Sequence, residues 1–192
     1  MSTLAVNQIT TQTGDTITLP TGKKIVGTDA ASIVAPGNVV QVVHTNPDTY
    51  QGFRYQASSQ SFADTGLVIQ ITPKFSDSII LVQGSVNIGT ASSDYNYLNM
   101  KRQISGGSVT DFGSVHTDGR NFGIVATGAG NAYGWYNVPI MYPDYNHGTT
   151  SQISYTFWMR NNGTSGTHYV GWTNDSNSRH NNIFLSATEI AQ

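Results

Sequence analysis

Five histidines are the side chains best suited to acid–base or metal chemistry. They are His44, His116, His147, His168 and His180. No two of them form the H-E-x-x-H pair of a zinc protease, and no G-x-S-x-G turn, phosphate-binding loop or G-x-G-x-x-G sequence follows an expected strand. Cysteine is absent, which excludes thiolate nucleophiles, disulfides and cysteine-ligated zinc. The sequence therefore predicts a non-enzymatic protein without a cofactor or a metal site.

Three polar stretches have some of the residues of a metal site. The stretch DSNSRHNN, from Asp175 to Asn182, begins with the spacing of a calcium loop but lacks its glycine at the sixth position and its acid at the twelfth. HTDG (116–119) and PDYNHG (143–148) are typical of turns. If three chains met on an axis, three copies of one histidine or aspartate would still be able to hold a metal.

Carboxylates decide whether the chain could cleave polysaccharides. Such an enzyme needs two acidic side chains in one cleft. Glu189 is the only glutamate, so the acids would have to be aspartates, and Asp111, Asp118 and Asp144 are the candidates. A polysaccharide-cleaving spike is therefore kept as a third hypothesis.

Aromatic residues give a sharper signal than the titratable ones. Six of them lie in or beside segments rich in glycine and asparagine: Tyr133, Trp135, Tyr136, Tyr142, Tyr145 and Trp172. Aromatic rings stack on the apolar faces of sugars, and neighbouring asparagine, aspartate and histidine can bind hydroxyl groups. The set predicts a glycan-binding surface. For each single residue the alternative is packing in the core or between subunits, where tyrosine and tryptophan are also enriched.

Charge and hydropathy exclude two classes of partner. The chain has 9 Lys+Arg against 11 Asp+Glu, and its formal net charge is -2. Binding to a phosphate backbone needs a basic face, so no nucleic acid is expected. The N-terminus has no positive region followed by an apolar run, and apolar runs such as Ile79–Val82 are too short to span a bilayer. Neither a signal peptide nor membrane insertion is expected.

Strands must position these residues, because the chain is rich in glycine and in β-forming residues and only 10% of it is charged. In the stretch from Gly66 to Gly89, two runs alternate apolar and polar residues around Pro73, Asp77 and Ser78, which predicts a half-buried hairpin. The same period of two recurs in NVVQVVH, YLNMKRQI, SQISYTFWMR and NNIFLSATEI. These strands predict an all-β fold, an antiparallel β-sandwich resembling a jelly roll.

The first 36 residues have a different pattern. Short apolar pairs such as Leu4 and Val6, or Ile17 and Leu19, are separated by turn signals. Segments this thin cannot bury their own apolar side, so we expect them to pair with copies of themselves or with another protein. The sequence therefore predicts an attachment or stalk segment over residues 1–36 and a head domain over residues 37–192.

Segments from both ends of the chain carry a resemblance to a known family. TLAVNQI, TITLPTGKKIVGTDAASIVAPGNVVQVV, ITPKFSDSIILVQGSV and LSATEIAQ resemble tail-fibre-like virion structural proteins of tailed phages, especially those of marine and cyanobacterial hosts. The middle of the chain, about residues 92–179, shows no such resemblance. The resemblance implies a homotrimeric component of the virus particle, in which the N-terminal segment binds another virion protein and the head contacts the host.

Two hypotheses of function follow for a chain of this kind. The leading hypothesis is a tail fibre or fibre-like appendage, associated with the phage tail, whose head loops bind a host glycan or receptor. The alternative is a capsid decoration or cement protein, in which the same head binds the shell. The two differ in their surfaces, because a host-binding head keeps its aromatic loops exposed and a decoration protein buries them.

Overall fold

The computed structural model describes residues 21–22, 26, 33–45, 55–57, 60–90, 95–112, 125–127, 135–161, 168–171 and 183–192. Within these ranges every regular element is a β-strand and no helix occurs. All strand pairs are antiparallel. The predicted all-β sandwich is therefore confirmed.

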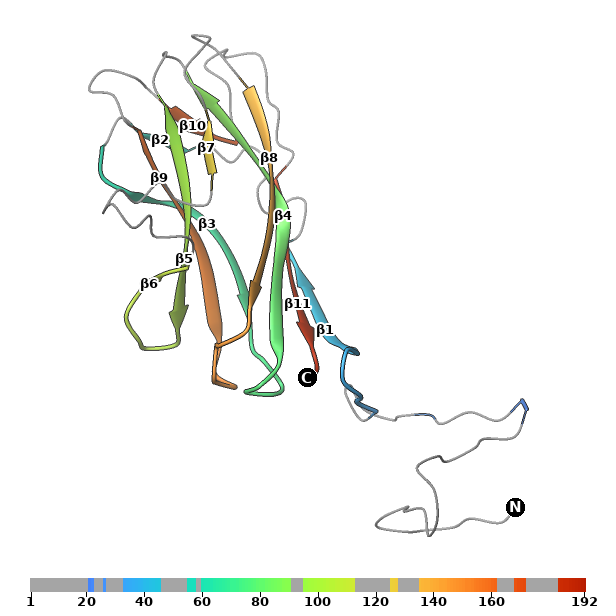
Figure 1. The fold of residues 1–192 in the computed structure, drawn as a ribbon. Coiled ribbons are helices and arrows are strands. Elements are labelled where there is room, and N and C mark those ends of the chain that lie inside the picture. The colour runs from blue at the N-terminus through green and yellow to red at the C-terminus, as the bar shows by residue number, and fades with distance from the viewer. Residues whose placement is uncertain are drawn as a thin grey trace. The chain divides into compact units, whose positions relative to one another are not determined.

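The strands form two sheets that face each other (Figure 1). Sheet A contains β1 (Val39–His44), β2 (Tyr55–Ala57), β4 (Ile79–Thr90), β8 (Trp135–Asp144), β10 (His168–Val170) and β11 (Phe184–Ile190). Sheet B contains β3 (Ala63–Ile71), β5 (Asn96–Ile104), β6 (Thr110–Asp111), β7 (Val125–Thr127) and β9 (Ile153–Asn161). In sheet A, β4 pairs with β11 on one side and with β8 on the other.

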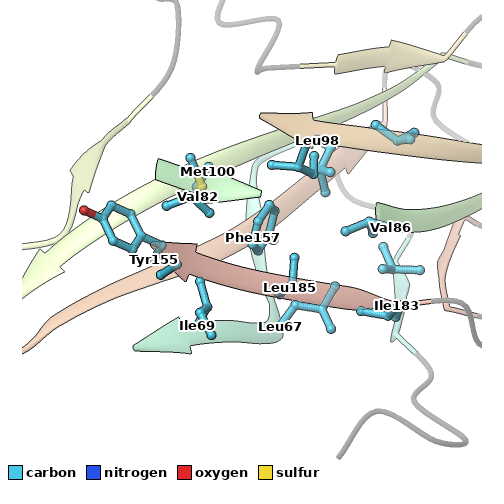
Figure 2. Packing of buried hydrophobic residues seen from close by; sticks show 14 of the residues in the cluster. Leu67, Ile69, Val82, Val86, Leu98, Met100, Tyr155, Phe157, Ile183 and Leu185 are labelled. Carbon is cyan, nitrogen blue, oxygen red and sulfur yellow. The ribbon is translucent and has the colours of Figure 1, made fainter. Parts of the chain in front are cut away.

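Alternating side chains from both sheets fill the core between them (Figure 2). The apolar positions expected to face inward do so: they include Leu67, Ile69, Ile71, Ile80, Val82, Val86, Ile88, Leu98, Met100, Ile153, Tyr155, Phe157 and Met159, all buried. Burial of such side chains stabilises the fold by about 1.5–3 kcal/mol each relative to exposure. The period of two thus predicted correctly which face of each strand is buried.

The predicted hairpin from Gly66 to Gly89 is wrong. Its two runs form β3 and β4, but β3 pairs with β9 in sheet B and β4 pairs with β8 and β11 in sheet A. The connection at residues 72–78 crosses from one sheet to the other, so the two apolar faces meet across the core. Alternation specifies the buried face of a strand and not its hydrogen-bonded neighbour, which is why the sequence suggested a pair.

Strand β8 was not expected, because Pro139 and Pro143 interrupt its sequence. Proline cannot donate a hydrogen bond to a neighbouring strand, so it is confined to the edges of sheets. Within the described residues, β8 pairs with β4 alone and forms such an edge. The aromatic residues of this segment therefore lie on a strand and not in a loop.

The sandwich has two distinct ends. At one, the proximal end, β1 begins and β11 finishes, and Gly37 N and Ala191 N donate hydrogen bonds to the carbonyls of Ala191 and Asn38 (Figure 1). The β3–β4 and β8–β9 connections lie at the same end, by strand register. At the opposite, distal end, β4 and β9 finish and β5 and β8 begin.

The chain divides into two compact units, Met1–Ile33 and Val34–Gln192. The second unit contains every strand of the sandwich. Most of residues 1–36 lies outside the described residues, so the predicted stalk and its boundary at residue 36 stay predictions.

Gly84 in β4 lies opposite Leu185 in β11 and leaves no room for a side chain. A Cβ at this position would collide with the carbonyl oxygen of Phe184 and would lie 2.8 Å from Cδ2 of Leu185. We expect Gly84→Ala to lower the free energy of unfolding by about 3 kcal/mol, because backbone cannot move aside as a flexible side chain can. Urea denaturation measures this effect. Gly107→Ala is the comparison, since its Cβ would lie 3.1 Å from the carbonyl oxygen of Ile104, which is tight but without the collision found at Gly84. We expect a clearly smaller loss there, and equal effects at the two positions would contradict the prediction.

Candidate functional site

The six predicted glycan-binding aromatic residues do not form one surface in the described structure. Tyr136 and Tyr142 are half-buried on the inner face of β8 and pack against the core. Tyr145, by contrast, is 57% exposed just after β8, at the proximal end. Trp135 begins β8 at the distal end. Tyr133 and Trp172 lie outside the described residues.

Tyr142 has a defined packing partner. Its ring meets the ring of Phe112 edge-on, with centroids 5.4 Å apart, and the Phe112 ring also lies 5.6 Å from that of Tyr155. Aromatic pairs in this geometry add stability beyond the area that they bury. The structure thus shows packing contacts for Tyr142 and for Tyr136, and glycan contact by the set of six stays a prediction.

The outer face of sheet B holds another group of aromatic side chains, beside cations and amides. We call it the cation–aromatic face, and it comprises Phe62, Tyr97, Asn99, Lys101, Asp111, Trp158 and Arg160. Cross-strand register places Tyr97 opposite Arg160, Asn99 opposite Trp158 and Lys101 opposite Asp111. The core residues Leu98, Met100, Phe157 and Met159 alternate with them, so these side chains lie on the other face of the sheet. Tyr97 and Asn99 are nevertheless buried, at 6% and 1% exposed, whereas Lys101, Trp158 and Arg160 are partly exposed.

Lys101 contacts both an aromatic ring and a carboxylate of this face. Its ammonium lies 4.1 Å from the centre of the Trp158 ring and 3.5 Å from Oδ1 of Asp111. Asn99 donates a hydrogen bond of 3.0 Å to the same carboxylate, and Nε1 of Trp158 donates to the hydroxyl of Thr156 at 3.0 Å. A cation over an aromatic face contributes about 0.5–1 kcal/mol at exposed sites. These contacts hold the side chains of Lys101, Asn99 and Trp158 in place.

Arg160 also contacts aromatic rings, in the part of the face nearer the distal end. Its guanidinium carbon lies 4.6 Å from the ring centre of Tyr97 and 5.3 Å from that of Phe62. The partly exposed ring of Trp158, beside the ammonium of Lys101 and the carboxylate of Asp111, is of a kind that suits a polar ligand with apolar faces, such as a saccharide. The outward alternation of Thr156, Trp158 and Arg160 is visible in the sequence. The pairing of β9 with β5 is not, and the sequence therefore did not reveal the face.

The candidate acids of a polysaccharide-cleaving site lie on opposite sides of sheet B. Asp111 contacts Lys101, which points outward, whereas Asp144 contacts Arg102, which points inward. Asp118 lies outside the described residues. Asp111 and Asp144 therefore do not share a cleft, and the two of them cannot act as the acid pair of a glycosidase.

Asp144 belongs to a buried ion pair. Its side chain is 1% exposed, and Nη1 of Arg102 lies 2.9 Å from both carboxylate oxygens. The hydroxyl of Tyr155 donates to Oδ2 at 2.8 Å, and the backbone N–H of Asn146 donates to Oδ1 at 3.2 Å. Burial, the charge of Asp144 and this hydrogen bond raise the pKa of Tyr155 far above its usual range, although Arg102 acts in the opposite direction. The cluster is a structural link between the two sheets.

Glu189, Ser78 and His147 form a second buried network at the proximal end. All three side chains are at most 3% exposed. The Ser78 hydroxyl lies 2.9 Å from Oε1 of Glu189 and 3.2 Å from Nε2 of His147. In a catalytic triad the histidine stands between the serine and the acid; here the serine stands between the other two. Nε2 of His147 also lies 2.8 Å from the carbonyl oxygen of Ser78, so the network is not arranged for nucleophilic attack.

The carboxylate of Glu189 is held by donors from two separate parts of the chain, strand β1 and the β3–β4 connection. It accepts hydrogen bonds from the backbone N–H groups of Lys74 and Phe75, the hydroxyl of Ser78 and the side-chain amide of Gln41. Burial opposes its ionisation, but these hydrogen bonds outweigh burial and hold the pKa of Glu189 below its ordinary value. Glu189 thus fastens β1 and the β3–β4 connection to β11.

Within the described ranges, no three histidine, aspartate or glutamate side chains gather to hold a metal ion. The same part of the chain contains no helix of the length and apolarity that crossing a membrane requires.

Comparison with known proteins gives only distant likenesses. No family model matches the chain, and no curated protein matches it. A structure of infectious bursal disease virus, Gx strain, is 10% identical with a TM-score of 0.38, over 88% of this chain and 42% of that chain, so this chain spans less than half of its length. The mitogen of Yersinia pseudotuberculosis is 14% identical with a TM-score of 0.23, over 69% of this chain and 87% of that one. Both TM-scores are too low to carry an argument about function.

Proposed function

We propose that this protein is a non-enzymatic structural component of a phage virion, a tail fibre or fibre-like appendage that contacts a host-surface glycan. In this proposal residues 1–36 bind another virion protein, and residues 37–192 form the head of a homotrimer. The sequence resemblance supports the class of protein. The distribution of residues over the two ends of the sandwich supports the contact role.

The polarity of the sandwich is the observation that carries the proposal. The head begins at the proximal end, where Gly37 and Asn38 bond to Ala191. Trp135 begins β8 at the opposite, distal end. A fibre attached through its N-terminal segment needs contact residues away from the attachment. The position of Trp135 in the chain supports the proposal in this respect.

Three segments that carry the family resemblance meet at one carboxylate. Gln41 lies in VVQVV, Lys74, Phe75 and Ser78 lie in ITPKFSDS, and Glu189 lies in LSATEIAQ. The shared residues therefore build the proximal scaffold and not the contact surface.

Gold-labelled antibody against residues 37–192, imaged on intact virions, tests the proposal. Gold on tail-associated appendages is the expected result. Gold spread over the capsid would instead favour the decoration protein, and an absence of gold from particles would contradict a virion protein of either kind. Unchanged viscosity of host polysaccharide after incubation with the wild-type protein is expected, whereas a fall would support the cleaving spike.

The cation–aromatic face gives a prediction about binding. We expect Trp158→Ala to weaken binding of the head to host cells by about tenfold, because a ring of this size contributes on the order of 1.4 kcal/mol to a contact that it dominates. Flow cytometry with labelled protein measures the effect. Val109→Ala is the control: the residue is 44% exposed in the β5–β6 connection, outside the cation–aromatic face, so its loss is expected to change binding less than twofold. Weaker binding by Val109→Ala than by Trp158→Ala would contradict a contact at the cation–aromatic face.

A further inference from the structure

The outer faces of the two sheets differ in charge. Sheet B carries Asp64, Lys101, Asp111 and Arg160 at outward positions. Sheet A, at the described outward positions of β1, β11, β4 and β8, carries no Asp, Glu, Lys or Arg. Charged residues are depleted at the centre of protein interfaces and common on free surfaces. The two faces therefore have different environments in the assembled protein.

Apolar side chains project from this uncharged face of sheet A. Met141 is 70% exposed, Val39 59%, Val42 54% and Phe184 48%. Leu81 and Ile190 also point outward and are partly exposed, and the polar side chains of Ser186, Thr188 and Gln83 lie among them. A soluble protein rarely leaves a contiguous apolar patch of several strands exposed unless a partner covers it.

We propose that the outer face of sheet A packs against further copies of this same chain, around a three-fold axis that runs along the strands. This inference rests on the homotrimer of the proposed function, but not on its place in a virus particle. A face without formal charge meets its own copy with no repulsion between like charges. A partner of different sequence would need no such neutrality, because it could supply opposite charges.

The dimensions of the face fit this arrangement. Four strands spaced about 4.8 Å apart make a face roughly 19 Å wide, and about ten residues at roughly 3.3 Å each make it roughly 33 Å long. Its flat area of roughly 600 Å² is shared between two neighbouring copies, whereas each partner buries roughly 800 Å² in a standard two-chain interface, so side-chain relief and further contacts must add to it. If three such faces form the sides of a triangular prism, the backbone of each sheet lies about 5–6 Å from the three-fold axis. Packed sheets usually lie about 10 Å apart, so each sheet is then at half that spacing from the axis, which leaves room for its side chains.

The edges of the face define which residues meet between copies. In a three-fold prism, β1 of one copy lies beside β8 of the next. Register across the sheet runs from His44 through Ser186 and Gln83 to Met141, so His44 and Met141 lie at one level along the strands. Rotation about an axis parallel to the strands preserves that level. His44 of one copy should therefore lie next to Met141 of the following copy.

Cross-linking tests this contact on a clean background, because the chain has no cysteine. The His44→Cys/Met141→Cys protein, treated with a short bifunctional thiol reagent, is expected to give covalently closed trimers on a denaturing gel. His44→Cys/Asn137→Cys is the matched control, since Asn137 lies four residues from Met141 along β8, roughly 13 Å away, and it should remain uncross-linked. Trimers from the control alone, or only dimers from the first pair, would overturn the arrangement.

Light scattering separates this inference from the proposal on which it rests. The wild-type protein should show three times the chain mass of 20.7 kDa at micromolar concentration, and Met141→Glu should shift it to monomer. Val109→Glu is the control, because Val109 is 44% exposed in the β5–β6 connection, and it should stay trimeric. A monomeric wild type overturns the trimer itself. A wild-type trimer that Met141→Glu leaves intact overturns only the sheet A interface.

Discussion

Replacement of Glu189 by alanine is expected to lower the free energy of unfolding by about 3 kcal/mol and the Tm by roughly 10 °C. The variant leaves the N–H groups of Lys74 and Phe75, the hydroxyl of Ser78 and the amide of Gln41 without their common acceptor. Each of these donors loses a hydrogen bond to a charged acceptor, and such a hydrogen bond is stronger than one between neutral groups. Urea denaturation at pH 7 measures the loss.

The pH dependence gives an independent check on Glu189. Its pKa in the folded protein lies below its ordinary value, so the folded state favours the ionised form. The corresponding stability is present above the unfolded pKa of about 4.3, and it is lost as the pH falls through the lower, folded pKa. Glu189→Gln should therefore flatten the acid limb of the stability curve.

Asp77→Asn is the matched control for the Glu189 variants, because it removes the same charge from an exposed position in the β3–β4 connection. We expect it to change stability by less than about 0.5 kcal/mol. If Glu189→Ala lowered the free energy of unfolding no more than Asp77→Asn, the hydrogen bonds to the Glu189 carboxylate would not stabilise the proximal end as the geometry indicates.

Removal of the cation beside Asp144 is the second large expected effect. Arg102→Met leaves a carboxylate that is 1% exposed without its partner, which costs about 3–5 kcal/mol for a buried ion pair. Guanidinium or thermal denaturation measures it. The double variant Arg102→Met/Asp144→Leu should recover most of the loss, because no buried charge then remains.

The neighbouring residue on β5 supplies the control for Arg102. Lys101→Met removes a cation whose partner, Asp111, is 40% exposed and 3.5 Å away. Exposed pairs contribute at most about 1 kcal/mol, so this variant should be nearly as stable as the wild type. Similar losses of stability in Lys101→Met and Arg102→Met would show that burial of Asp144 is not the cause of the destabilisation.

Buried faces were predictable from the sequence, and strand partners were not. The alternation around Leu67, Val82 and Phe157 identified inward positions correctly, because a half-buried strand must place every second side chain in the core. The same alternation is equally compatible with a partner in the same sheet or across the sandwich. The error at Gly66–Gly89 follows from this ambiguity.

The surroundings of the candidate site residues were also not predictable from the sequence, for the same reason. Tyr136 and Tyr142 stand among prolines and polar residues, which suggested loops, yet they occupy inward positions of an edge strand that tolerates Pro139 and Pro143. Trp158 looked like an ordinary outward residue of a strand. Its neighbours Lys101 and Asn99 are more than fifty residues away in sequence, so only the β5–β9 pairing brings the group together.

The pairing of β1 with β11 has a mechanical consequence. The chain passes into β1 at the proximal end, and β1 lies antiparallel to β11, with backbone hydrogen bonds perpendicular to both strands. A pull on the N-terminal side, opposed by a grip at the distal end, acts along β1 and loads all of these bonds at once in shear. A pull across the strands would break them one after another. The sandwich therefore resists tension along β1 better than tension across it.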